Sequence, residues 1–153
     1  MAIEAPYSKY RKNNFKIAIV ILVILSGWFV YDGYYNENFL KKNTDADGNP
    51  NSTLVFNRQS PPWFILAAVA AGVYLFIIRS RKIIADENEL SINGKEKIPY
   101  DAMQKIDKTH FESKGFFIIT YKNKDGSEVN RRLSDRAYDN LSAVLEHLVA
   151  KIS

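Results

Sequence analysis

Two uncharged apolar runs in the first half of the chain constrain its fold more than any other feature. They cover residues 17–31 and 59–78, which are 15 and 20 residues long. A helix needs ~20 residues to cross a hydrocarbon core about 30 Å thick, so the second run is long enough by itself. The first run would rise only about 22 Å, and Phe15 together with the snorkelling side chain of Lys16 extends it. We therefore predict a membrane hairpin with transmembrane helices over residues 17–35 and 59–78.

Charged and aromatic residues at the ends of the runs predict the orientation of this hairpin. Seven basic residues flank the outer ends: Lys9, Arg11, Lys12, Lys16, Arg79, Arg81 and Lys82. Five aromatic residues lie near the ends that the loop joins: Trp28, Tyr31, Tyr34, Tyr35 and Trp63. Basic residues favour the cytoplasmic side, and Trp and Tyr favour membrane interfaces. Both signals predict an integral protein of the cytoplasmic (inner) membrane, with residues 1–16 and 79–153 cytoplasmic and residues 36–58 outside.

The distribution of charge bears on the partners. A net charge of +4 and a pI near 9.2 would alone suggest nucleic acid as a partner. However, residues 1–16 and 79–82 each carry +3, while residues 32–60 and 83–153 each carry −1. The positive excess therefore lies beside the apolar runs. This excludes nucleic acid and favours anionic membrane lipids, at about 1 kcal/mol per basic group near the surface.

Small residues in the second run bear on helix packing. They are Ala67, Ala68, Ala71 and Gly72, in pairs at a spacing of four residues. Such residues let a neighbouring helix approach closely, from the first span, a second copy or another subunit; alanine-rich filler explains the spacing equally well. Neither run holds a charged residue that an ion pathway needs. No A-x-A-like site follows the first run, which favours an uncleaved anchor over a signal peptide.

The polar segment between the runs predicts an exposed connection with at most short local structure. Its Asp45–Asn49 stretch superficially resembles a calcium loop, but Pro50 and Phe56 stand where an EF-hand needs Gly and Glu. An Asx/Gly turn is the better interpretation. Asn51-Ser52-Thr53 also fits a glycosylation acceptor.

Short β-type segments separated by turns follow the second run. We predict strands near residues 82–86, 89–92, 95–99, 105–110, 116–121 and 128–133. A three-residue loop ending at Gly126 would pair Tyr121 with Val129 and Phe117 with Leu133, and would place Gly126 in the left-handed conformation. Pairing of Leu90 with Ile98 likewise requires a loop longer than two residues at Asn93-Gly94.

A terminal helix is predicted after Ser134 or Asp135, either of which can cap its first turn. Its apolar stripe has helical spacing and comprises Ala137, Leu141, Val144, Leu145, Leu148 and Ile152. The opposite side mixes acidic and basic residues, so the helix is expected to cover the sheet rather than to bind a membrane surface.

This order of elements resembles the small bacterial pleckstrin-homology-like (PH-like) domains that follow paired membrane helices. The resemblance is carried by residues 83–90, 98–106 and 115–121, the Asp125-Gly126 turn and the final helix. It implies a curved antiparallel sheet or barrel, plugged by the helix, with a role in recognition and assembly. Three departures stand out. The loop assigned to the first strand, residues 86–89, is acidic, the final helix lacks tryptophan, and six strands are visible where seven are usual.

Candidate catalytic chemistry is sparse in this sequence. The chain has no cysteine, which removes thiolate metal sites and cysteine nucleophiles. On a strand, His110 and Glu112 would share a face while Asp107 pointed away, which leaves two ligands and a weak metal site. A solvated strand end is the better interpretation, and His147 is expected at the edge of the helical stripe.

We therefore expect an α+β protein: a transmembrane hairpin plus a small antiparallel β domain with a C-terminal helix. The expected role is non-catalytic, as a membrane-anchored interaction or scaffolding module with a protein partner or a second copy. It would need no cofactor, metal or small-molecule substrate. The alternative is a small accessory subunit of a larger membrane complex.

Overall fold

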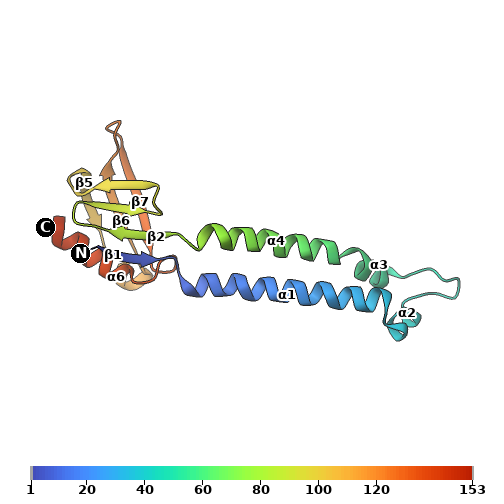
Figure 1. The fold of residues 1–153 in the computed structure, drawn as a ribbon. Helices are drawn as coiled ribbons and strands as arrows, with labels where there is room; N and C mark the ends of the chain where they lie inside the picture. Colours follow the sequence, from blue (N-terminus) through green and yellow to red (C-terminus); the bar gives the residue numbers. More distant parts are fainter. Residues whose placement is uncertain (1, 153) are drawn as a thin grey trace. The chain divides into compact units, whose positions relative to one another are not determined.

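A computed structural model describes residues 2–152, which divide into two compact units (Figure 1). The first combines the chain through Lys12 with the chain from Ile77 onward, and we call it the β unit. The second, Asn13–Phe76, is the helical unit. Together they contain two long apolar helices, two small antiparallel sheets and a C-terminal helix. The predicted α+β class is therefore confirmed.

The first long helix, α1, spans Lys9–Tyr34 and begins eight residues earlier than the predicted span. Its 26 residues rise about 39 Å. The Asp139 carboxylate explains the early start, because it accepts a hydrogen bond from the backbone N–H of Lys9 at 2.9 Å. Such a cap comes from a residue far along the chain, so the local sequence gives no sign of it.

The second long helix, α4, spans Pro61–Ile78. Its start at Pro61 agrees with the preference of proline for the first helical position. A shorter helix, α3, spans Ser52–Gln59, and Ser60 between the two keeps right-handed helical dihedral angles. The second apolar helix therefore forms a nearly continuous stretch over Ser52–Ile78.

The segment between the long helices is more helical than predicted. Besides α3 it contains α2, Glu37–Lys42. Side-chain oxygens of Asn36 and Asn51 cap the two helices by accepting the N–H groups of Phe39 and Leu54. The predicted Asx turn is confirmed, since the Asp45 carboxylate accepts two backbone N–H groups, at 3.0 and 2.7 Å.

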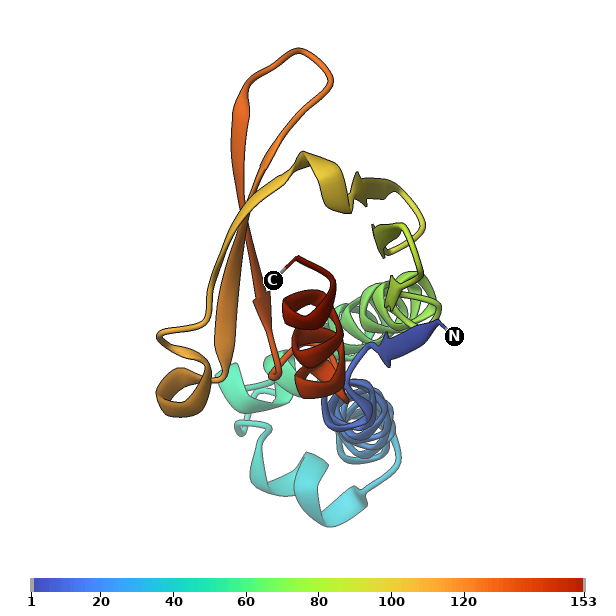
Figure 2. The ribbon, with the colours of Figure 1, turned by 90° about the vertical axis from the view of Figure 1, so that its left-hand side faces the viewer.

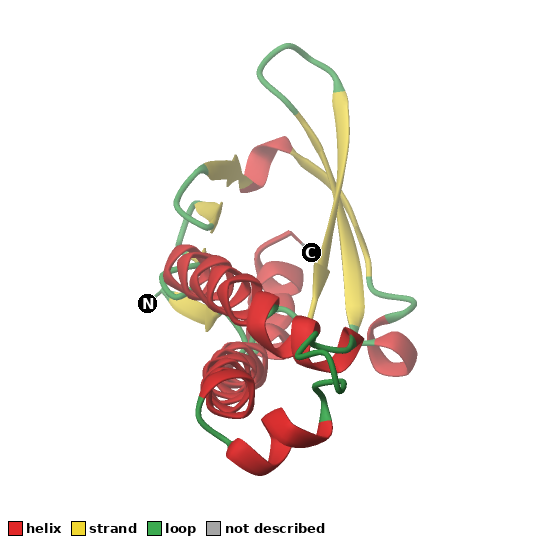
Figure 3. Ribbon diagram, turned by 90° about the vertical axis from the view of Figure 1, so that its right-hand side faces the viewer, coloured by secondary structure: helices red, strands yellow, loops and turns green. Residues whose placement is uncertain are grey.

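The β unit contains a four-stranded sheet ordered β1-β2-β3-β4 and a three-stranded sheet ordered β5-β6-β7, both antiparallel. A short 3-10 helix, Tyr100–Ala102, leads from one sheet to the other. Figures 2 and 3 show β6 and β7 as a long twisted hairpin that projects beyond the neighbouring strands. The elements are β1 (Ile3–Pro6), β2 (Lys82–Ala85), β3 (Glu89–Ile92), β4 (Glu96–Pro99), β5 (Met103–Asp107), α5 (Phe111–Lys114), β6 (Phe116–Lys122), β7 (Glu128–Ser134) and α6 (Leu141–Ile152).

The predicted strand register is confirmed at each pair that the sequence specified. Leu90 lies opposite Ile98, Phe117 opposite Leu133, and Tyr121 opposite Val129. The β6–β7 loop has Gly126 at its left-handed position, with φ of 83°. Alternation of apolar residues and turn chemistry are both local signals, and together they set the register.

Strand β1 was missed by the sequence interpretation, which treated residues 1–16 as a basic tail. It pairs with β2 through Ile3–Ala85 to Pro6–Lys82 and supplies a seventh strand. The strand is only four residues long and ends in proline, and its partner follows the helical unit in the chain. Consequently the whole helical unit lies in the connection after the first strand. Residues 86–88 instead lie between β2 and β3, and Glu89 begins β3, so the assignment of residues 86–89 to the first loop was wrong.

The terminal helix α6 begins at Leu141 rather than after Ser134 or Asp135. Ser134 ends β7, and Asn140 interrupts the helical pattern with a left-handed φ of 62°. Helix α6 lies beside both sheets (Figure 2), and one of its faces is buried in their common core, as predicted, although Ala137 of the predicted stripe lies outside the helix. The buried residues of this face are Leu141, Val144, Leu145 and Leu148.

The predicted strand through His110 is also wrong, since β5 ends at Asp107. The Asp107 carboxylate accepts the N–H and the hydroxyl of Thr109, at 3.0 and 2.6 Å, and so forms a turn. These hydrogen bonds hold the pKa of Asp107 below its ordinary value. His110 lies in the turn and Glu112 in α5, so no strand places them on one face.

Candidate functional site

Large apolar side chains are exposed on both long helices. In the apolar 18-residue stretch of α1 only 6% is buried, and in the corresponding stretch of Ser52–Ile78 only 17% is buried. Exposure of so large an apolar surface to water would cost about 25 cal/mol of free energy per Å². Both helices are long and apolar enough to cross a membrane. The seventeen exposed large apolar residues on α1 and α4 are Tyr10, Ile17, Val20, Ile21, Val23, Ile24, Trp28, Tyr31, Tyr34, Trp63, Ile65, Leu66, Val69, Val73, Tyr74, Phe76 and Ile77.

Within the helical unit, α1 and α4 contact each other through a few side chains. The Ser26 hydroxyl donates to the Pro61 carbonyl at 3.2 Å, and the rings of Phe15 and Tyr74 lie 4.9 Å apart. Farther along α1, Gly33 leaves little room, because a Cβ there would lie 3.2 Å from Cγ of Arg58. Arg58 Nε donates to the Gly33 carbonyl at 2.9 Å and fixes this approach.

The small residues predicted for helix packing are used unequally. Ala68 is buried, whereas Ala67 is exposed. Ala71 is half-buried, and a Cβ on Gly72 would meet no atom within 4 Å. Most of this small-residue surface is thus not filled by the described chain. Ser26 and Gly33 are the closely packed positions on α1, and the sequence analysis missed them. Their packing partners, Pro61 and Arg58, do not belong to the small residues that were predicted to pack.

All five predicted aromatic anchors are exposed, from 54% for Tyr34 to 71% for Tyr35. Trp28 Nε1 donates to the Asp32 carboxylate at 2.8 Å, and the Arg58 guanidinium lies 5.4 Å from the centre of the Tyr34 ring. Apolar ring faces and charged groups therefore occur together at this end of α1. That combination is typical of a boundary between an apolar phase and water.

The structure divides the predicted basic residues by their surroundings. Four of them lie on the first turns of α1: Lys9, Arg11, Lys12 and Lys16. Arg79 and Arg81 lie between α4 and β2, while Lys82 lies on β2 itself. The Lys82 ammonium is 2.6 Å from the Glu4 carboxylate of β1, so a cross-strand ion pair already uses its charge.

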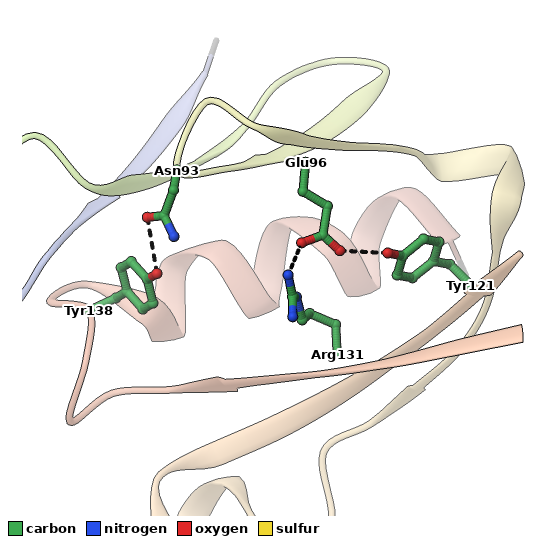
Figure 4. Close-up of polar contacts among 5 residues, drawn as sticks. All are labelled: Asn93, Glu96, Tyr121, Arg131 and Tyr138. Atoms are coloured by element: carbon green, nitrogen blue, oxygen red, sulfur yellow. Dashed lines mark hydrogen bonds and ion pairs between the residues drawn. The ribbon is translucent and has the colours of Figure 1, made fainter. Parts of the chain in front are cut away.

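A polar cluster joins the two sheets of the β unit, as Figure 4 shows. Glu96 of β4 accepts the Tyr121 hydroxyl of β6 at 2.5 Å and pairs with Arg131 of β7. Nearby, the Tyr138 hydroxyl donates to Asn93 Oδ1 at 3.0 Å. Burial, followed by the hydrogen bond to Glu96, raises the pKa of Tyr121. Polar contacts from Glu96 therefore connect the four-stranded sheet to the three-stranded sheet, in addition to the apolar core that they share.

Sequence reasoning missed the Glu96–Arg131 pair, although strand alternation holds a trace of it. Glu96 is two residues from buried Ile98, and Arg131 is two residues from buried Leu133. Alternation therefore places both charges on the inward sides of their strands. Opposite charges at inward positions of two strands indicate that each needs a partner. Which two residues pair can be decided only when the arrangement of the strands is known.

The β unit carries open grooves, of which two are larger than the rest of those described. One, of about 850 Å³, runs between α5 and α6 over Phe111, Leu145 and Val149. The other, of about 1040 Å³, follows β4 and the β6–β7 hairpin and includes the Glu96–Arg131 pair. Across residues 2–152, no three His, Asp or Glu side chains group as metal ligands would. Comparison of the chain with protein-family models, curated proteins and solved structures finds no match.

Proposed function

We propose that this chain is an integral membrane protein in which α1 and α4 cross the cytoplasmic (inner) membrane. The β unit would be a PH-like interaction domain on the cytoplasmic side, and the role would be recognition or scaffolding. One observation carries this proposal: the long helices expose their large apolar side chains, while the β unit buries its own. A bilayer supplies the apolar surroundings that such helices require.

The strand count supports the PH-like interpretation. With β1 included, the β unit has seven strands in sheets of four and three, followed by a helix that packs on both. Seven is the number usual in the PH-like family, so one of the three departures in the sequence is removed. In this interpretation, the membrane hairpin is an insertion between the first two strands of the domain.

Basic residues on α1 and after α4 support cytoplasmic termini and contact with anionic lipid. Those proposed to contact lipid headgroups are Lys9, Arg11, Lys12, Lys16, Arg79 and Arg81. Lys82 contributes less, because it is paired with Glu4. A basic group near an anionic surface adds about 1 kcal/mol of attraction.

Labelling of single cysteines tests the membrane topology, because the natural chain has no cysteine. Asp47→Cys probes the segment between the helices, and Ser113→Cys probes α5; both positions are exposed. In sealed inside-out vesicles, a membrane-impermeant maleimide should label Cys at 113 directly and Cys at 47 only after detergent is added. Labelling of both from one side, or release of the protein by alkaline carbonate, would contradict the proposal.

A second candidate function is an accessory subunit of a larger membrane complex. It is favoured by the unfilled small-residue surface around exposed Ala67 and open Gly72. Gly72→Leu tests this, because the described chain has room for the larger side chain. Loss of a protein that co-purifies in mild detergent would indicate that another subunit packs there. Unchanged co-purification would contradict packing at this surface.

A further inference from the structure

The groove along β4 and the β6–β7 hairpin is rich in basic residues, and we call it the lysine groove. Five cationic residues line it: Lys95, Lys97, Lys122, Lys124 and Arg131. Only two acidic residues, Glu89 and Glu96, line it as well. Residues 83–153 have a net charge of −1, so this positive balance is local. The groove therefore concentrates cations that the composition of the domain does not predict.

Both acidic residues of the groove are already paired. The Lys97 ammonium lies 2.8 Å from the Glu89 carboxylate, which raises the pKa of Lys97, and Arg131 pairs with Glu96. Three ammonium groups are left: Lys95, Lys122 and Lys124. Within residues 2–152, none of these three makes an ion pair. The lysine groove thus offers an outside partner three positive charges that no ion pair within the described residues uses.

The geometry of the groove favours an extended peptide over a flat membrane surface. The groove is a depression of about 1040 Å³, and Tyr121, Pro99 and Ala102 add uncharged surface to its lining. Strand β4 is the outer strand of its sheet, so one edge of it is open. An extended segment can add to such an edge through main-chain hydrogen bonds, with alternate side chains reaching the neighbouring surface.

We propose that the lysine groove docks an extended acidic segment of a partner protein. The carboxylates of that segment pair with Lys95, Lys122 and Lys124, while its backbone follows the open edge of β4. Glu96 holds Arg131 in place, so Arg131 shapes the groove and contributes less to the charge that the partner meets. This inference rests on the proposed role of the β unit as an interaction module and names the chemistry of its partner.

The test uses the full chain in nanodiscs of uncharged lipid and a fluorescent peptide that alternates Glu with Val. Binding is measured by anisotropy as salt is raised, because screening weakens exposed charge pairs. Replacement of Lys95, Lys122 and Lys124 by Gln should weaken binding about tenfold, as the loss of three exposed pairs implies. The matched control replaces Lys105, Lys108 and Lys114, exposed residues outside the groove, by Gln and should change affinity less than about twofold.

Three outcomes would overturn the inference. The first is equal weakening by both triple variants, which shows attraction to the overall charge. The second is unchanged peptide binding, together with lost binding to vesicles of phosphatidylglycerol, which assigns the lysines to a membrane surface. The third is no peptide binding by a protein that stays in the nanodisc; in that case the membrane proposal stands and the inference fails. Failure of the membrane proposal would instead be seen as release by alkaline carbonate.

Discussion

The helical unit and the β unit place their apolar side chains in opposite ways. In the β unit, Phe117 and Ile119 are fully buried between two sheets and α6. In the helical unit, Trp63 is 70% exposed and Leu66 is 59% exposed. The same kinds of residue therefore occupy two different positions, one in the interior of the protein and the other on the outer surface of the long helices. The comparison therefore says more about the role of each unit than overall composition does.

The polar groups of the two units differ as well. In the β unit, inward polar residues such as Glu96 and Arg131 satisfy each other across the sheets. In the helical unit, the backbone hydrogen bonds of the helices are internal, which is what a hydrocarbon environment requires. Polar side-chain contacts such as Trp28 with Asp32 lie near the end of α1. Substitutions in the two units are therefore expected to have different effects.

The largest effect is expected for aromatic truncation in the β unit. Phe117→Ala should cost about 3–5 kcal/mol of unfolding free energy, because it opens a cavity among residues that cannot close it. Trp63→Ala makes a similar truncation at a 70% exposed position and should leave the β unit unchanged. Hydrogen exchange of β6 amides measures both variants, and equal protection in the two would contradict the contrast between the units.

An arginine on the apolar surface of α4 gives the next largest effect. Val69 is 56% exposed, and a charge in the middle of a membrane helix costs about 2.5–3.5 kcal/mol. Val69→Arg should therefore lower the fraction of protein that resists alkaline extraction from membranes. Ser113→Arg adds the same charge to exposed α5 and should not change this fraction. An unaffected Val69→Arg protein would indicate that this surface faces water.

How far the sequence could predict this structure depended on whether the signals were local. The pairs Leu90–Ile98 and Phe117–Leu133 follow from strand alternation and turn length, and both are confirmed. The start of α6 was predicted too early because the apolar spacing continues to Ala137, while the left-handed Asn140 interrupts the helix. Strand β1 was missed because four residues carry little pattern and their partner strand follows the helical unit.

The candidate sites followed the same rule. The exposed aromatic residues of α1 were predicted from their position at the end of an apolar run, which is a local feature. The Glu96–Arg131 pair and the lysine groove bring together β4 and the β6–β7 hairpin, which belong to different sheets. No local pattern states which strands face each other, so these features required the tertiary structure.

Removal of the inter-sheet carboxylate should have an intermediate effect. Glu96→Ala leaves Tyr121 and Arg131 without their shared partner and should cost about 1–2 kcal/mol of unfolding free energy. Glu128→Ala removes an exposed carboxylate of β7 and serves as the matched control. Denaturant unfolding followed by the near-ultraviolet circular dichroism of tyrosine measures both. A loss no greater than that of the control would show that the cluster does not help to hold the sheets together.

The cap on the first turn of α1 should contribute a smaller amount. Asp139→Ala removes the acceptor for the Lys9 N–H and should cost about 1 kcal/mol, seen as faster exchange of the first amides of α1. Asp139→Asn keeps an oxygen acceptor in the same place and should retain most of the protection. If Asn and Ala gave equal exchange rates, the start of α1 at Lys9 would need another cause.

The smallest effect is expected from titration of Tyr100, a residue of the β unit. Burial, followed by the nearby charges of Asp86 and Glu89, raises the pKa of Tyr100 from about 10 to about 12. Between these values the unfolded chain loses the phenolic proton while the folded chain keeps it, so stability present below pH 10 falls as the pH rises toward 12.

Tyr100→Phe should reduce this loss, measured as a shallower decline of the denaturation midpoint with pH. A remaining slope is expected, because the raised pKa values of Tyr121 and Lys97 act in the same direction. Tyr31→Phe removes the hydroxyl of an exposed tyrosine on α1 and supplies the control for the substitution itself. An identical profile for the natural chain and Tyr100→Phe would show that the phenol keeps its ordinary pKa. Such a result would also show that the hydrogen bond from the Tyr100 hydroxyl to the Asp86 carbonyl does not stabilise the connection before β3.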